Sequence, residues 1–423
     1  MVKQSRRQFV GAGIAALALG TAARAQSAGS QAATHRVVVI GGGAGGATAA
    51  RHIARATKGE IDVTLIEANK TYRSCFFSNH YLGGFRDFGG LEHGYGTLAS
   101  DYGITVVHDL AKAIDRDKKK IELTGGSLRY DTLILAPGID FVDGSVNGWS
   151  LDDQDKMPHA YQGGAPVRLL RAQIEAMPAG GVFAIVPPQG TYRCPPGPYE
   201  RLTIIAHLLK QINPTAKIII ADPKPLFSKM SLFRESWRKY YKGMIDMNSD
   251  VDMSTFEVDP DDMTIRLDGE TIKVDACNVI PSQKAGKIAE LAGLTVDGWA
   301  PVYAHDMRSK VDDNIYVLGD AAAQGDMPKS AFSANSQAFA CAEAILARLQ
   351  DRELPEPDYN NICWSLLAPQ DSVKIGASYE ATPDGIKRVE GFVSQRREGA
   401  EIRKETYEES LAWYESIVAD MFG

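Results

Sequence analysis

Short, uninterrupted apolar runs recur along the chain, and two of them are followed by a turn and then by a helical pattern. The first run, 37–40, leads through a glycine-rich turn at 41–46 into an alanine-rich stretch. The second, 182–186, leads through a turn into an expected helix at 201–211 and another apolar run at 217–221. Apolar runs without alternation are typical of strands buried on both faces of a parallel sheet. The pattern predicts an α/β fold with two Rossmann-like units.

The first turn has the glycine spacing of a dinucleotide-binding loop. Gly41, Gly43 and Gly46 are spaced so that the backbone can turn tightly, approach a pyrophosphate and let the helix pack on the strand. The N-terminus of that helix would then hold the phosphate charge. The next expected strand, 62–66, is followed by Glu67, whose carboxylate suits a ribose hydroxyl. Together these features predict a dinucleotide site.

Two later segments indicate which dinucleotide is bound. The strand-like run at 314–318 leads into Gly319 and Asp320, which resembles the second FAD fingerprint of flavoproteins with two dinucleotide-binding domains, where the aspartate binds the ribityl chain. The segment 132–138 resembles their middle fingerprint. Either segment alone is equally compatible with a core strand, but the three signals occur in the expected order, and FAD is the predicted cofactor. The expected domains are a discontinuous FAD-binding domain (36–165 and 286–350), a second Rossmann-like domain (166–285) and a smaller C-terminal α+β domain (351–423).

The turn of the second unit departs from a nucleotide-binding loop. Between 187 and 200 it contains five prolines and Cys194 where NADH-using relatives have glycines. Proline lacks the backbone N–H that would hold a phosphate, and it adds bulk to the loop. We therefore expect no NAD(P)H site and an electron donor smaller than NADH.

The first 25 residues differ in character from the rest of the chain. Arg6 and Arg7 precede a weakly apolar run of mostly glycine and alanine, which ends in an Ala-Arg-Ala triplet at 23–25. This is typical of a twin-arginine export signal. An anchored N-terminal helix is the alternative, but the run is shorter than the ~20 residues that a membrane span needs. We expect segment 1–25 to be removed, the mature chain to reside in the periplasm, and no integral membrane segment in it.

Length and charge limit the classes of partner. A chain of 423 residues is long enough for two or three domains. Its formal net charge of −7 argues against a nucleic-acid partner, because binding to phosphates requires a basic surface, whereas a basic protein partner is compatible with it. Five cysteines in an oxidising compartment leave an odd thiol that needs a role. No metal site is predicted.

Three motifs are similar to those of one family. The segments 192–200 (YRCPPGPYE), 327–331 (MPKSA) and 361–365 (NICWS) resemble the flavoprotein subunit of flavocytochrome c sulfide dehydrogenases, which are relatives of sulfide:quinone oxidoreductases. The resemblance extends throughout the mature chain. It implies oxidation of sulfide with FAD, and a c-type cytochrome as acceptor, either a subunit or a soluble protein. It also implies a redox-active disulfide at the flavin, formed by Cys194 and Cys363.

Disulfide chemistry at these cysteines is consistent with sulfide oxidation. Hydrosulfide attacks one sulfur of a disulfide, so that one cysteine becomes a persulfide and the other leaves as a thiolate. We expect Cys194 to receive the attack, because Glu200 lies six residues after it, and Cys363 to meet the flavin. Flavin suits this position because it accepts electron pairs and releases them singly. A purely structural disulfide between two domains is the alternative.

The other cysteines have different expected roles. Cys75 follows the second strand at the position where the family carries a thioether to the flavin, and this link would account for the odd thiol. Its alternative is a buried core cysteine beside Phe76 and Phe77. Cys277 and Cys341 are expected to be small buried apolar residues.

Three more residues each have two possible roles. Glu200 resembles the family's active-site glutamate, a base for hydrogen sulfide, but a carboxylate there also suits a helix N-terminus. Trp413 corresponds to an aromatic residue that closes the sulfide pocket, or it packs in the core. Lys329 is placed to stabilise negative charge on reduced flavin, or it is a surface lysine.

Competing functions differ in the electron acceptor. A sulfide:quinone oxidoreductase attaches to the membrane through an apolar C-terminal surface, and 411–422 does form an apolar helical stripe. Its other face is acidic, however, whereas membrane-surface helices are usually basic. A non-catalytic flavin-bearing accessory of a sulfur-oxidation complex is disfavoured because both cysteines and Glu200 are retained. An NADH-dependent disulfide reductase lacks support because the second glycine loop is missing.

Overall fold

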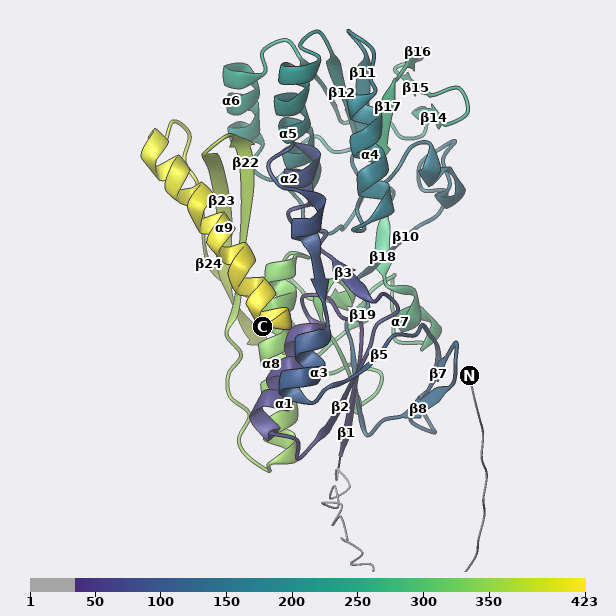
Figure 1. Cartoon of the computed structure of the whole chain (residues 1–423), viewed down its shortest axis with the longest axis vertical. Coiled ribbons are helices and arrows are strands. Elements are labelled where there is room, and N and C mark those ends of the chain that lie inside the picture. The colour runs from purple at the N-terminus through teal and green to yellow at the C-terminus, as the bar shows by residue number, and fades with distance from the viewer. Residues whose placement is uncertain (1–34) are drawn as a thin grey trace, which may run out of the picture.

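A five-stranded parallel sheet lies at the centre of the first Rossmann-like unit (Figure 1). The structure is a computed structural model that describes residues 35–423, so the expected export signal at 1–25 lies outside the described residues. The strands of this sheet are β1 (Arg36–Ile40), β2 (Asp62–Ile66), β5 (Thr105–Val107), β9 (Thr132–Leu135) and β20 (Ile315–Val317). Their order is β20-β9-β1-β2-β5, and each neighbouring pair is parallel. A strand from late in the chain therefore completes a sheet begun by the first residues described.

Glycine is required in the turn after β1 because backbones approach closely there. Gly41 has a φ of +102°, and a Cβ at this residue would lie 2.3 Å from the carbonyl oxygen of Ala136. A Cβ on Gly46 would lie 1.9 Å from the carbonyl oxygen of Gly41. The two glycines let the chain turn tightly from β1 into helix α1 (Gly46–Thr57), against which α8 (Ala331–Leu349) packs.

A second parallel sheet forms the second Rossmann-like unit, in the upper half of Figure 1. Its order is β13-β12-β11-β17, with strands β11 (Val182–Val186), β12 (Lys217–Asp222), β13 (Ile245–Ser249) and β17 (Ala276–Val279). The accompanying helices are α4 (Ala165–Glu175), α5 (Gly197–Ile212) and α6 (Met230–Tyr240). Helix α5 begins four residues before the expected start at Arg201, because Pro198 occupies its first turn, where proline is well accommodated.

The C-terminal part is an antiparallel sheet covered by a long helix. Strands β22 (Tyr359–Ala368), β23 (Asp371–Thr382) and β24 (Gly385–Val393) pair in sequence order. Helix α9 (Ala400–Phe422) packs on β23 and continues down to α1 in the first unit, as its yellow ribbon shows in Figure 1. At its end the Phe422 ring lies 5.5 Å from the rings of Tyr72, Tyr95 and His93. One helix thus connects the C-terminal sheet to the first unit.

The remaining strands and helices are short. They are β3 (Thr71–Arg73), α2 (Ser78–Leu82), β4 (Glu92–Gly94), α3 (Gly96–Tyr102), β6 (Ala111–Asp115), β7 (Lys120–Leu123), β8 (Ser127–Arg129), β10 (Ile139–Phe141), β14 (Glu257–Asp259), β15 (Thr264–Leu267), β16 (Glu270–Lys273), β18 (Gln283–Ala285), α7 (Lys287–Leu291), β19 (Ala300–Pro301) and β21 (Ala322–Ala323), with 3-10 helices at Phe88–Leu91, Leu151–Asp155 and Gly319–Ala321.

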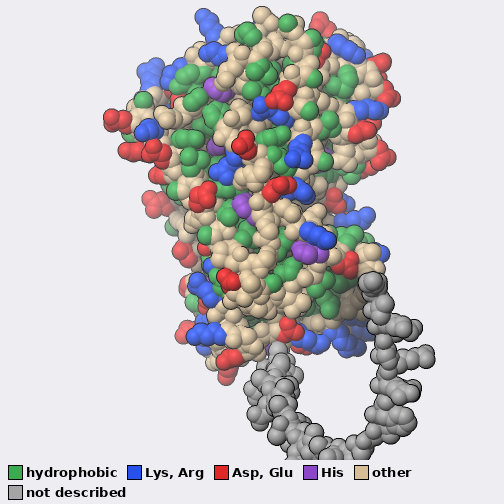
Figure 2. Space-filling model, in the orientation of Figure 1, with side chains coloured by type: hydrophobic (Ala, Val, Ile, Leu, Met, Phe, Trp, Pro, Cys, Tyr) green, Lys and Arg blue, Asp and Glu red, His purple; other side chains and the backbone are tan. Residues whose placement is uncertain are grey.

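The surface carries charges of both signs. In the view of Figure 2, Lys and Arg side chains are interspersed with Asp and Glu over the upper part of the face, without a large field of one sign. Among residues 35–423, no helix has the length and apolar character needed to cross a membrane.

Candidate active site

The glycine turn opens onto a long cleft in the first unit. Its walls carry Gly41, Gly43, Glu67, Gly319 and Asp320, so the structure brings together residues that the sequence assigned to FAD. Gly46 does not line the cleft and serves the packing of α1 instead.

Three observations test whether this cleft suits a dinucleotide. A Cβ on Gly43 would meet only the Tyr72 ring, at 3.6 Å, so glycine is not needed there for packing and leaves room for a ligand. Glu67 is held at the rim, where its carboxylate accepts hydrogen bonds from the N–H of Gly42 and of Asn69, both 2.9 Å. The Oδ1 atom of Asp320 is buried without a hydrogen-bond partner among the described residues. An orphaned acceptor and an open glycine backbone fit the hydroxyl and phosphate groups of FAD.

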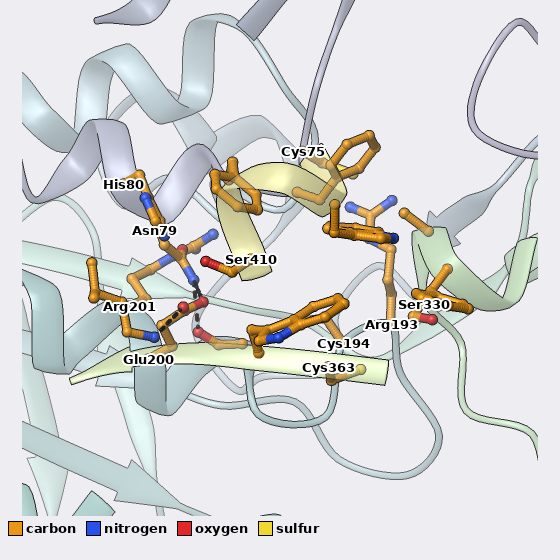
Figure 3. Close-up of a pocket in the computed structure, with 18 of the residues that line it drawn as sticks. Cys75, Asn79, His80, Arg193, Cys194, Glu200, Arg201, Ser330, Cys363 and Ser410 are labelled. Atoms are coloured by element: carbon orange, nitrogen blue, oxygen red, sulfur yellow. Dashed lines mark hydrogen bonds between the residues drawn. The ribbon is translucent and has the colours of Figure 1, made fainter. Parts of the chain in front are cut away.

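A second, mostly apolar pocket adjoins the cleft (Figure 3). Cys75, Phe76, Arg193 and Ala331 line both cavities, so the two meet at these residues. The second pocket, which we call the sulfur pocket, brings together most of the other residues that sequence reasoning selected. These are Cys75, Cys194, Glu200, Cys363 and Trp413.

Cys194 lies in the loop before α5 in a strained conformation. Its φ is +56°, a value that non-glycine residues rarely adopt. Its N–H donates to the carbonyl of Lys329 (2.8 Å), and its carbonyl accepts from the N–H of Gly197 (2.7 Å). A Cβ on Gly197 would lie 3.0 Å from the Cys194 sulfur. The two backbone hydrogen bonds therefore hold Cys194 in place, and glycine at 197 leaves the space that its sulfur needs.

Cys363 enters the same pocket from strand β22. Figure 3 shows the two cysteines on the lower side of the pocket and Cys75 on the upper side. The structure contains Cys194 and Cys363 as free thiols, and the predicted bond between them stays a prediction. Burial raises the pKa of both thiols, so a thiolate at either position needs a nearby cation.

Glu200 lies in the first turn of α5, with both carboxylate oxygens occupied. Oε1 accepts from the N–H of Leu366 and Oε2 from the Asn79 amide, both at 2.8 Å (Figure 3). Burial raises the pKa of Glu200, and these two hydrogen bonds oppose the rise. Asn79 also accepts from Nε of Arg201 (3.0 Å), so it connects the acid to a buried cation. A carboxyl group with a raised pKa suits proton exchange near neutral pH.

Sequence reasoning missed three cations in or beside the sulfur pocket, of which Arg201 and Lys229 are buried. Arg193 lies at the junction of the two cavities, 3.7 Å from Asp320. Arg201 donates to backbone and amide oxygens, and Lys229 donates to the carbonyl of Cys363 (2.9 Å) and to Ser365 Oγ (2.8 Å). Burial lowers the pKa of Lys229 to about 8. Glu200 is the one carboxylate lining this pocket among the described residues, so the site favours an anion.

Lys329 and Trp413 differ in how they relate to the two cavities. Lys329 lines neither of them, because its ammonium donates to the carbonyls of Asp320 and Ala322 and lies 3.6 Å from the Trp299 ring centroid. Its expected contact with the flavin stays a prediction, and the cations that line the cleft are Arg73 and Arg193. Trp413 lines the sulfur pocket, with its ring centroid 6.0 Å from that of Phe332.

Cys277 and Cys341, as expected, are fully buried core residues.

Family models match three segments of the chain. The central part of the flavoprotein chain of sulfide dehydrogenase [flavocytochrome c] matches 167–281, and the flavin-binding part of flavocytochrome c sulphide dehydrogenase matches 355–422. The resemblance to flavocytochrome c sulfide dehydrogenase flavoproteins is confirmed. The pyridine nucleotide-disulphide oxidoreductase family matches 35–160. These matches show that the chain is similar to FAD-dependent, sulfide-oxidising oxidoreductases, and FAD is the cofactor that the flavocytochrome c sulfide dehydrogenase resemblance supports.

Solved structures share the fold of this flavocytochrome c sulfide dehydrogenase-like chain. The sulfide:quinone oxidoreductase of the hyperthermophilic bacterium Aquifex aeolicus is 18% identical with a TM-score of 0.68, over 91% of this chain and 92% of that one. Putidaredoxin reductase in its covalent complex with putidaredoxin is 16% identical with a TM-score of 0.66, over 89% and 94%. A NAD-dependent persulfide reductase from A. fulgidus is 17% identical with a TM-score of 0.61, over 88% and 77%. At these identities the likeness concerns the fold alone, and the predicted fold class is confirmed.

Proposed function

We propose that this protein is a periplasmic sulfide:cytochrome c oxidoreductase. The observation that carries the proposal is the convergence of Cys194, Cys363 and Glu200 in one apolar pocket, which meets the flavin cleft at Cys75. Three cations in or beside that pocket, Arg193, Arg201 and Lys229, favour the hydrosulfide anion over neutral ligands.

The first chemical step belongs to Glu200 and Cys194. Glu200 takes a proton from hydrogen sulfide, and hydrosulfide attacks the sulfur of Cys194 in a Cys194–Cys363 disulfide. The S–S bond breaks, Cys194 carries the persulfide, and Cys363 leaves as a thiolate that holds the electron pair. Lys229, bound to the backbone carbonyl of Cys363, places a positive charge near that thiolate. FAD, when bound, accepts electrons in pairs and releases them singly to a one-electron acceptor.

The packing of α9 supports a cytochrome rather than a quinone as acceptor. On its apolar stripe, Tyr414, Ile417, Met421 and Phe422 are buried against the protein itself, and Leu411 and Val418 are half-buried. Apolar side chains already covered in this way are not available to a membrane surface. A c-type cytochrome, as a subunit or a diffusing protein, suits the acidic net charge.

Two features of the second unit support the absence of an NAD(P)H site. Asp222, at the end of β12, corresponds in position to the acid that binds ribose in a dinucleotide site. It is fully buried, accepts a hydrogen bond from the Tyr199 hydroxyl (2.6 Å) and pairs with Lys224 (2.8 Å). The acid is therefore occupied within the protein, and prolines replace the glycines of the loop.

Steady-state assays with alternative donors and acceptors test this function. The holoprotein should reduce a c-type cytochrome with sulfide as donor, and NADH should leave the flavin oxidised. Faster reduction of a soluble quinone analogue than of cytochrome would favour the quinone alternative. Absence of sulfide-dependent flavin bleaching would instead favour a non-catalytic accessory role. Detection of the mature chain, lacking 1–25, in a periplasmic fraction tests the proposed export.

Cys75 is expected to bind the flavin covalently. Cys75 lines both the cleft and the sulfur pocket, which supports the proposed link, and the family resemblance supplies the thioether chemistry. Acid-precipitated protein should retain its yellow colour in the pellet. In Cys75→Ala the acid step should release the FAD into the supernatant, and before that step the bound flavin should be harder to reduce. Cys277→Ala, in the core of the second unit, should keep its FAD in the pellet. Complete release of FAD from the unaltered protein would contradict the link.

A further inference from the structure

The hydroxyl group of Tyr161 is buried without a partner. The side chain is 4% exposed, it lines the sulfur pocket, and its hydroxyl has no hydrogen-bond partner among the described residues. Buried tyrosine hydroxyls usually find a partner, because leaving one unpaired costs free energy. An unpaired donor at the edge of a reactive pocket indicates a ligand that completes the hydrogen bond.

The Tyr161 ring is held rigidly beside two cations. The guanidinium groups of Arg193 and Arg201 lie 5.7 Å and 5.0 Å from its ring centroid. Arg201 also donates to the carbonyls of His159 (3.2 Å) and Ala160 (2.7 Å), which fixes the backbone just before the tyrosine. The orientation of the hydroxyl therefore follows from the packing of its neighbours, as preorganised donors require.

The same hydroxyl lies close to the sulfur of Cys194. Both atoms surround the position that a Cβ on Gly197 would occupy, with the Tyr161 oxygen 2.8 Å and the Cys194 sulfur 3.0 Å from it. Glycine at 197 leaves this space open beside both side chains. An atom bonded to the Cys194 sulfur would have this hydroxyl as a close donor.

We propose that the Tyr161 hydroxyl donates a hydrogen bond to the outer sulfur of a persulfide on Cys194. This inference rests on the proposed function. Hydrosulfide forms the new S–S bond at Cys194 as the Cys194–Cys363 bond breaks, the electron pair leaves with the Cys363 thiolate, and the added sulfur remains on Cys194. The hydroxyl stabilises the charge that this outer sulfur carries once its own proton is lost.

The ionisation of Tyr161 supports a role as a permanent donor. Burial raises the pKa of Tyr161 well above its ordinary value, and the charge on a Cys194 thiolate raises it further, while Arg201 and Arg193 oppose the rise. The phenol therefore remains protonated at neutral pH. Proton removal from hydrogen sulfide stays with Glu200, and Tyr161 supplies a hydrogen bond only.

The test compares the Tyr161→Phe holoprotein with the unaltered protein and with Tyr130→Phe. Tyr130 is a matched control, because its hydroxyl is also buried without a partner among residues 35–423, whereas its side chain belongs to the core of the first unit and lines neither cavity. One equivalent of sulfide is added without oxygen, and the sulfane sulfur is trapped with cyanide and counted as thiocyanate. We expect Tyr161→Phe to lower the yield and to reduce kcat on the order of 10²-fold with little change in KM.

The controls separate this inference from the proposed function. If the unaltered protein yields no thiocyanate, the proposed function fails. If it does and Tyr161→Phe matches it in yield and kcat, the hydrogen bond to the persulfide is refuted. A changed FAD content or flavin spectrum in Tyr161→Phe would assign the hydroxyl to flavin binding. An unfolded Tyr161→Phe protein, or an equal loss of thiocyanate yield and kcat in Tyr130→Phe, would assign the Tyr161 hydroxyl a structural role. Each of these outcomes overturns the proposal.

Discussion

Sulfide-dependent reduction of the flavin is expected to fall by about 10³-fold or more in both Cys194→Ser and Cys363→Ser. The two thiols enter the sulfur pocket from different parts of the chain, the loop before α5 and strand β22, so neither can replace the other. Serine cannot form the disulfide that hydrosulfide attacks. Stopped-flow bleaching of the flavin under anaerobic conditions measures this step without the acceptor.

The same pair of variants assigns the two roles. Cys194→Ser leaves a thiolate at Cys363, which we expect to meet the oxidised flavin and to produce a long-wavelength charge-transfer band. Cys363→Ser should show no such band. Cys277→Ala is the control, since that thiol is buried in the core of the second unit, and its activity should match the unaltered protein. A band in Cys363→Ser would reverse the assignment, and full activity in either serine variant would refute the disulfide mechanism.

Replacing Lys229 with methionine is expected to raise the pKa of the Cys363 thiol by about one unit or more. The ammonium group is bound to the Cys363 carbonyl and to Ser365 Oγ, and the titratable groups that face it are Cys363, Glu200 and Cys194. Since burial lowers the pKa of Lys229 to about 8, the lysine is cationic below that pH and neutral above it. Its stabilisation of a thiolate is thus present below about pH 8 and is lost as the pH rises through it.

Alkylation of Cys363 in the Cys194→Ser background measures this effect. The pH at which the alkylation rate reaches half its maximum should move upward in Lys229→Met and return in Lys229→Arg, which keeps the charge.

The free energy of unfolding gives an independent measurement, and the contribution of Lys229 to it should increase with pH. Between pH 8 and the ordinary lysine pKa of about 10.5, Lys229 binds more protons in the unfolded chain than in the folded one, so the free energy of unfolding should rise with pH over that range. Lys229→Met should not show this rise. An unchanged pH profile of alkylation in Lys229→Met would show that Lys229 has only a structural role, as a hydrogen-bond donor to strand β22.

The sheets could be predicted from sequence because their strands are uninterrupted apolar runs. The runs that begin at residues 37, 62, 182 and 217 are strands β1, β2, β11 and β12, with ends within about a residue of those expected. In the segment expected to form the C-terminal α+β domain, the sequence does not reveal that strand β23, which begins at Asp371, extends as far as Thr382. Propensity gave no sign of this extension, because pairing with β22 and β24 supplies it.

The site could be predicted only where a motif surrounds the residue. Cys194, Glu200 and Cys363 lie in distinctive segments, whereas Lys229 is a single lysine in the segment 228–231 (SKMS), which resembles an ordinary surface turn. Tyr161 and Asn79 likewise lack a local signal, because their importance arises from which segments fold against them. Arg193 stands inside a recognised motif, but its position between two cavities depends on tertiary packing. Buried charge is a property of the folded chain, and composition does not reveal it.

The path of helix α9 has a consequence for how the protein is made. Tyr414 on this helix contacts His93, 321 residues earlier in the chain, with its hydroxyl 2.9 Å from the imidazole, and Trp413 closes the pocket beside Phe76. The ribosome synthesises the glycine turn and Cys75 long before it synthesises α9. During translation the sulfur pocket therefore lacks the wall that Ser410 and Trp413 supply. Completion of α9 adds that wall, so the sulfur pocket is complete only after nearly the whole chain has been synthesised.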